Sequence, residues 1–127
     1  MALVHHELCF GCGRVNLFGL LFELERDGDA GVAGRCFLKQ DHQGPERGEA
    51  HPGLIATALT EAMALACSST AVPQTVSVEH LGLPRVGTFL QVRARVETRH
   101  GGIAQTSATA TAEDQRPVAH ARAKFRD

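Results

Sequence analysis

The sequence predicts an α+β fold in which an antiparallel β-sheet wraps around one long helix. The first observation is the run from Pro52 to Ala71, which is rich in Ala, Leu and Met and carries one charge, at Glu61. The second is a series of segments in which apolar and polar residues alternate. A helix with so little polar surface is normally buried all round. Each of these segments has one apolar face, which must be buried against another element. The simplest packing therefore places the helix against that face of the sheet.

The length suits one domain. A chain of 127 residues builds a single core, so we expect one domain over residues 1–127. The hydrophobic fraction of 43% and the charged fraction of 21% are ordinary for a globular protein. We find no internal repeat, low-complexity tract or linker.

The helix is expected between two prolines. Pro52 in the first turn favours a helix start, and Pro73 is expected to help end it. About 18 residues would make a rod roughly 27 Å long. Because Ala dominates the run and Thr, Ser and Glu interrupt it, the segment is a poor candidate for spanning a membrane.

The clearest strands follow the helix. Thr88–Glu97, Ile103–Ala112 and Val118–Arg126 each alternate between apolar and polar residues and are separated by short turns. This pattern predicts an antiparallel meander. The apolar side of these strands is largely Ala, which lets a helix approach closely. Earlier strands are expected at Leu17–Glu25, Val32–Lys39 and Gln74–Leu81.

Composition argues against some classes of partner. The formal net charge is −1, and the chain has six Phe but no Trp or Tyr, so neither a basic field nor many stacking rings are available for nucleic acid. Residues 1–7 show no basic region followed by a long apolar run, so we expect no signal peptide and no membrane partner. The expected location is the cytoplasm, where the four Cys would stay free thiols.

A C-x-x-C pair lies near the N-terminus, at Cys9 and Cys12, with His5 and His6 close by. A structural zinc site usually needs four ligands, and this short stretch supplies three at most. The preferred interpretation is therefore a turn around its glycines, with metal binding as the alternative. We expect no stoichiometric zinc.

Four motifs in order carry a resemblance. They are Cys9-Phe-Gly-Cys-Gly followed by Asn16-Leu-Phe-Gly-Leu, then His42-Gln-Gly, then His51-Pro-Gly followed by Leu-Ile-Ala-Thr-Ala-Leu-Thr-Glu-Ala-Met, and Leu83-Pro-Arg-Val-Gly. Together they resemble the hotdog thioesterase superfamily, in particular small acyl-CoA thioesterases related to the phenylacetate-pathway enzymes. The resemblance covers nearly the whole chain.

The resemblance implies a hotdog fold whose subunits pair into a continuous sheet, with acyl-CoA sites between subunits. We therefore expect a homodimer or a dimer of dimers. The implied reaction is hydrolysis of a small or medium acyl thioester carried by CoA or an acyl-carrier protein, without a metal or organic cofactor. Glu61 would be the general base or nucleophile, and the helix N-terminus near Gly53 would polarise the carbonyl. The alternative for Glu61 is a structural hydrogen bond.

Two departures from the family pattern lie where the chemistry belongs. The family places its acid nine positions after the motif His, where this chain has Thr60; Glu61 is one residue, or about 100°, further round the helix. Pro52 replaces a Gly whose N–H contacts the thioester oxygen, and proline has no N–H. Losing one such donor typically costs roughly 100- to 1,000-fold in rate, although the Gly53 N–H is placed to substitute. A hotdog protein that binds an acyl thioester or another apolar ligand without turnover is therefore the second hypothesis.

Further candidates surround these residues. His80 shares a strand face with Val76 and Val78 and is predicted to point towards the helix. With Thr60 and Glu61 it resembles the Thr, Glu and His set of a fluoroacetyl-CoA thioesterase; a core histidine is the alternative. His51 would shape the thioester pocket or cap the helix. Thr57 and Thr60 would contribute to the site or bond a backbone carbonyl. Candidates for substrate binding are Gln43, Gly53, Thr57 and Arg85, and CoA phosphates could also meet Arg93, Arg99 and Lys124, for which a surface role is the default.

Overall fold

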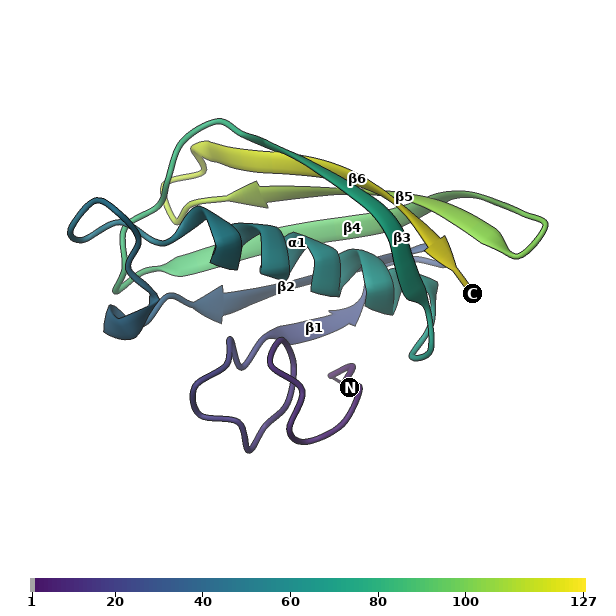
Figure 1. Ribbon diagram of the computed structural model, residues 1–127, viewed down its shortest axis with the longest axis horizontal. Helices are drawn as coiled ribbons and strands as arrows, with labels where there is room; N and C mark the ends of the chain where they lie inside the picture. Colours follow the sequence, from purple (N-terminus) through teal and green to yellow (C-terminus); the bar gives the residue numbers. More distant parts are fainter. Residues whose placement is uncertain (1) are drawn as a thin grey trace.

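The computed structural model describes residues 2–127, so Met1 of the N-terminal stretch assessed above lies outside the described residues. One long helix lies along one face of a curved sheet (Figure 1). The elements, in chain order, are β1 (Glu23–Arg26), β2 (Gly31–Phe37), the 3-10 helix η1 (Gln40–His42), α1 (Pro52–Cys67), β3 (Val72–His80), β4 (Phe89–His100), β5 (Ile103–Thr111) and β6 (Pro117–Arg126).

The sheet has six strands in the order β1-β2-β4-β5-β6-β3, and every neighbouring pair is antiparallel. The expected α+β arrangement of an antiparallel sheet around a long helix is confirmed. The meander is present as β4, β5 and β6. Because β3 follows α1 in sequence but pairs with β6, it lies at one edge of the sheet, and β1 lies at the other.

The helix begins as expected and ends earlier. Its first residue is Pro52, preceded by the N-cap His51, and its last residue is Cys67, after which the Ser68 N–H donates to the Ala64 carbonyl at 3.0 Å. The expected extension to residue 71 is wrong, because residues 68–71 already turn into β3. Pro73 lies inside β3 rather than ending the helix. An edge strand tolerates proline, and the register of β3 against β6 shifts between Pro73 and Thr75.

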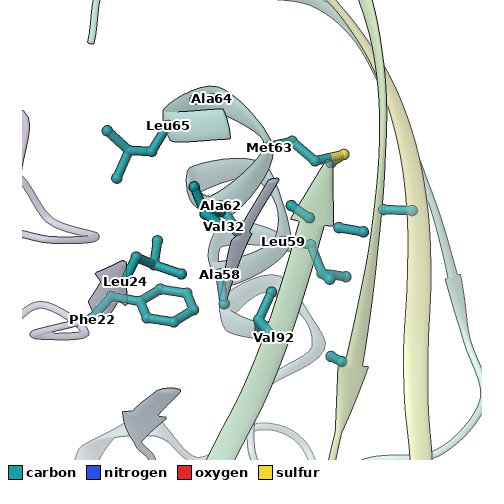
Figure 2. Close-up of a cluster of buried hydrophobic side chains, with 14 of the residues drawn as sticks. Phe22, Leu24, Val32, Ala58, Leu59, Ala62, Met63, Ala64, Leu65 and Val92 are labelled. Atoms are coloured by element: carbon teal, nitrogen blue, oxygen red, sulfur yellow. The ribbon is translucent and has the colours of Figure 1, made fainter. Parts of the chain in front are cut away.

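The core fills the space between α1 and the sheet. Leu59 and Met63 of α1, Phe22 just before β1 and Val92 of β4 are all buried in this core (Figure 2). On the later strands the buried face is made mainly of alanines, namely Ala94, Ala104, Ala108, Ala110, Ala119, Ala121 and Ala123. Because these side chains are small, the helix lies close to the strands.

The prediction for the first strand differs most from the structure. Leu17–Glu25 was expected to be extended, but β1 covers only Glu23–Arg26, and the described residues before it contain neither helix nor strand. Their backbone is held by single hydrogen bonds, in which the Leu20 N–H donates to the Phe10 carbonyl and the Phe22 N–H to the Gly11 carbonyl, each at 2.8 Å. Within residues 2–127, no helix has the length and apolar character needed to cross a membrane.

Candidate active site

Several predicted site residues meet at the N-terminal end of α1. The loop before the helix folds back on itself through a bridge between Gln43 and Ala50, and a second bridge joins Glu49 to Arg85. The Gln43 side chain accepts a hydrogen bond from the Gly48 N–H at 2.7 Å and donates to the Gln40 carbonyl at 2.9 Å. Its amide therefore holds the loop in place. Arg85 is exposed beside this loop.

The helix start is capped by His51. Its Nδ1 accepts a hydrogen bond from the Gly53 N–H at 2.8 Å. The capping role, which the sequence left as an alternative, is thus present. The N–H expected to polarise a substrate carbonyl already has a partner, and Pro52 has no N–H to offer. A carbonyl at this end of the helix must displace the exposed His51 ring.

The two threonines of the helix bond to the backbone. Thr57 Oγ1 donates to the Gly53 carbonyl and Thr60 Oγ1 to the Ala56 carbonyl, each at 2.8 Å. These are the local bonds that Thr commonly makes in helices. Thr60 is therefore tied to its own helix.

Glu61 faces the N-terminal segment. Its side chain is only 12% exposed, and its Oε2 lies 2.9 Å from His5 Nδ1 and 3.5 Å from Cys9 Sγ. Cys12 Sγ lies 3.5 Å from the same His5 nitrogen. Gly11 lies against the carboxylate so closely that a Cβ there would be 2.5 Å from Glu61 Cδ. A larger residue at position 11 would displace the Glu61 side chain, so glycine leaves room for the carboxylate in its present place.

Cys12 is not set up as a nucleophile in the ion-free chain. It is fully buried, and this burial raises the pKa of its thiol, as do its hydrogen bond and charge interaction with Glu61. A thiol in such surroundings keeps its proton at neutral pH, whereas a nucleophilic cysteine needs the thiolate. All four cysteines are free, as expected.

His80 lies at the end of β3, on the side predicted for it. The register pairs Val76, Val78 and His80 with residues of β6 that are buried against the helix, namely Ala123, Ala121 and Ala119. The alternative of a core histidine is wrong, however, because His80 is exposed, as is Val76. Among the described residues, Val78 between them packs partly against the core, whereas Val76 and His80 stay exposed beside α1.

The distant basic candidates separate into two kinds. Arg99 is used internally, with Nη1 2.5 Å from Asp127 and Nη2 donating to the Cys67 carbonyl at 2.8 Å. Arg93 and Lys124 are exposed, and Arg93 lies 3.6 Å from Asp27. Neither lies at the helix start.

The sequence singled out Glu61 but missed its partners. His5, Cys9 and Cys12 were recognised as a group, yet Glu61 lies 49 positions after Cys12 and no local pattern connects it to them. The glycines at positions 11 and 13 were the available signal, since they mark a loop that approaches another segment closely. The folded chain therefore brings together four potential metal ligands, where the N-terminal stretch alone supplies three at most.

This chain resembles known proteins in structure but not in sequence. No protein-family profile matches the chain, and no curated protein matches it in sequence. The PaaI protein from the phenylacetic acid degradation operon of E. coli superposes with a TM-score of 0.77 at 18% identity, over 85% of this chain and 84% of that one.

Two similar structures hold ligands. A hypothetical thioesterase protein from Streptococcus pneumoniae TIGR4, solved with coenzyme A, has a TM-score of 0.75 at 18% identity, over 82% of this chain and 86% of that one. The protein smu.793 from Streptococcus mutans UA159, bound to acetyl-CoA, has a TM-score of 0.75 at 21% identity, with the same coverage. These likenesses show that the chain has the hotdog fold found in thioesterase-superfamily proteins.

Proposed function

We propose that this hotdog chain is an acyl-CoA thioesterase that hydrolyses a small or medium acyl thioester. The observation that carries the proposal is one partly buried carboxylate, Glu61, on an otherwise uncharged central helix. Its Oε2 is paired with His5, and a carboxylate that is partly removed from water in this way is suited to act as a base. Similar structures that hold coenzyme A or acetyl-CoA support the choice of ligand.

In this proposal Glu61 is the general base. It removes a proton from water, which attacks the thioester carbonyl, and the thiolate of CoA leaves. A carboxylate has about four lone-pair positions, and His5 and Cys9 both contact Oε2, so the group keeps acceptor capacity for a water molecule. His80 and Thr60 are the other candidates near this reaction, and Gln43, Thr57 and Arg85 are candidates for holding the substrate.

The carbonyl is held at the helix start, where it replaces the ring of His51 as acceptor for the Gly53 N–H. Within one chain Gly53 and Glu61 are eight residues apart, which is about 12 Å along a helix. Reacting groups must approach to about 3–3.5 Å. This separation favours taking the two functions from different copies, which supports a site between subunits.

The proposed assembly is a homodimer, or a dimer of dimers, formed through β3. This edge strand has unpaired backbone groups along one side and exposes the apolar residues Val72 and Val76. An open apolar edge is a template for pairing with another chain. Pairing two copies there would cover the strip beside α1 that includes His80.

A second candidate function is binding of an acyl thioester without turnover. It is favoured by the helix start, where Pro52 lacks an N–H and the Gly53 N–H already bonds to His51. A chain without a free donor for the carbonyl oxygen would bind the thioester but stabilise its transition state poorly.

One experiment separates the two functions. A panel of acyl-CoA substrates of increasing chain length is incubated with the protein, and free CoA is detected with a thiol reagent. Protein without substrate serves as the control, because the chain has four thiols of its own. The same acyl-CoA compounds are titrated by calorimetry. Release of CoA supports the thioesterase, and binding without release supports the second candidate function. The absence of both release and binding would contradict both functions.

A further inference from the structure

Four metal-ligating side chains converge between the N-terminal segment and α1. The ligand atoms of His5, Cys9, Cys12 and Glu61 all lie within 4.8 Å of one another. Three come from a stretch of eight residues, and the fourth comes from the middle of the helix. Cys12 is fully buried, and the side chains of His5 and Glu61 are 18% and 12% exposed.

We propose that His5, Cys9, Cys12 and Glu61 form a four-coordinate zinc site. Bond lengths of about 2.3 Å to sulfur and about 2.0–2.2 Å to nitrogen or oxygen place the ligand atoms of a tetrahedral zinc site roughly 3.3–3.8 Å apart. His5 Nδ1 lies 3.7 Å from Cys9 Sγ and 3.5 Å from Cys12 Sγ. Cys9 Sγ lies 3.5 Å from Glu61 Oε2.

One edge of the cluster is shorter. His5 Nδ1 and Glu61 Oε2 are 2.9 Å apart, the length of a direct hydrogen bond. An ion between these two atoms would replace the shared proton and move them apart by a few tenths of an ångström. Both side chains end on rotatable bonds, so the adjustment needs no change in the backbone.

The geometry does not fit a catalytic relay of Cys, His and Glu. In such a relay the imidazole contacts the nucleophile with one ring nitrogen and the orienting carboxylate with the other. Here both sulfurs and the carboxylate approach the same nitrogen, His5 Nδ1. Three groups that point at one nitrogen surround a common centre, which is where an ion would lie.

The loop around the cluster is shaped to bring the ligands together. The His5 N–H donates to Cys12 Sγ at 3.1 Å, which supports a sulfur that carries negative charge. A Cβ at Gly13 would lie 2.4 Å from the Glu7 carbonyl oxygen, so only glycine fits the turn that follows Cys12. The Gly13 N–H also donates to the Cys9 carbonyl at 2.9 Å, which closes the turn between the two sulfurs.

The ligand chemistry selects the metal. Thiolate and imidazole ligands suit zinc, whereas magnesium and calcium prefer oxygen. Four protein ligands leave no open position, which is the pattern of a structural zinc site. The ion would anchor residues 2–22, which lack helix and strand, to the central helix. This inference goes beyond the proposed function. It is compatible with that function, because a Glu61 carboxylate bound to zinc through Oε2 keeps lone pairs on Oε1 that can accept a proton.

The test begins with metal content. The full chain is purified without a histidine tag and under reducing conditions, and zinc is measured by elemental analysis. We expect about one zinc per chain, as a structural site requires. Cys9→Ser and Cys12→Ser are each expected to lower it at least tenfold. Cys67→Ser, at the far end of α1, is the matched control and should keep the ion.

A second measurement uses the unaltered chain, so it does not depend on whether a variant folds. Zinc is removed with a chelator and Co²⁺ is added. We expect absorption from thiolate–cobalt charge transfer and from tetrahedral Co²⁺, and loss of both on adding Zn²⁺. Glu61→Gln keeps both thiolates, so the charge-transfer band should persist while the affinity for Co²⁺ falls at least tenfold.

Several results would overturn the proposal: no zinc and no cobalt spectrum, zinc that persists when both Cys9 and Cys12 are replaced, or unchanged affinity in Glu61→Gln. A disulfide between Cys9 and Cys12 in the reduced preparation, seen as two titratable thiols instead of four, would also contradict it. None of these measurements uses an acyl-CoA, so failure of the thioesterase proposal leaves the metal test unaffected.

Discussion

Glu61 is the one residue at which both proposals meet. It is the sole charged residue of α1, and its environment is set by a loop some 50 positions earlier in the sequence. The sequence identified the residue because a charge in an apolar helix is conspicuous. It could not identify His5 as the neighbour, because that contact depends on how the N-terminal segment crosses the helix.

Replacing Glu61 by Gln tests its role as base. The amide keeps nearly the same shape but accepts a proton poorly, so kcat on the best acyl-CoA is expected to fall about 100- to 10,000-fold. Thr60→Ala, whose hydroxyl bonds to its own helix, should change kcat far less. Each variant is assayed well below its own measured melting temperature, because Glu61 is also a proposed zinc ligand. Near-normal turnover by Glu61→Gln together with loss in His80→Ala would move the role to His80.

His42 gives the chain a sensitivity to acid. It is buried, and this burial lowers the pKa of the imidazole because it penalises the charged form. In the unfolded chain His titrates near its ordinary value of about 6.5. As the pH falls through that value the unfolded state gains a proton that the folded state resists, so this contribution to stability is present at neutral pH and is lost in acid.

The corresponding variant is His42→Asn. The Asn oxygen can accept the hydrogen bond that His42 Nδ1 now takes from the Lys39 N–H at 3.0 Å. Between pH 7.5 and 5.5 the unfolding free energy of the natural chain should fall by up to about 1.4 kcal/mol more than that of the variant, from this site alone. Urea unfolding at both pH values measures the difference, and equal pH dependence would show that His42 does not cause it.

At the scale of elements, alternation and composition predicted which strands and helix form, whereas composition did not predict where the helix ends. Strands β4, β5 and β6 begin and end within three residues of their predicted positions, because their alternating pattern continues to the turns. The end of α1 was overestimated because Ser68 to Ala71 remain compatible with a helix in composition. What ends the helix is the need to bring β3 alongside β6, which is a tertiary contact that composition does not contain.

The alanine face of the sheet sets how close α1 can lie. Ala108 of β5 is buried on this face, whereas Thr109 beside it is exposed. Ala108→Leu should destabilise the fold by about 1–3 kcal/mol, the usual cost of overpacking. Thr109→Leu, which places the same side chain on the exposed side of the strand, should cost far less. Thermal unfolding of both measures the contrast, and equal losses would argue against close packing at this face.

At the scale of the molecule, the open edge at β3 is the feature that predicts assembly. Light scattering at micromolar concentration should give at least a dimer. Val76→Lys places a charge on this strand and is expected to shift the mass towards a single chain, because the charge would be buried on pairing. Val15→Lys, at a similarly exposed valine in the N-terminal segment, should leave the mass unchanged. A single-chain mass for the natural protein would contradict the dimer.

The separation of eight residues between Gly53 and Glu61 predicts how mixtures of two variants behave. If each site takes its carbonyl-binding end from one copy and its carboxylate from the other, two inactive variants can restore each other. A Gly53→Val chain retains Glu61, and a Glu61→Gln chain retains Gly53. Mixed dimers of the two contain one intact site and one doubly defective site, so random mixing should recover about a quarter of the natural activity. Mixtures that stay inactive would show that each chain acts on its substrate alone.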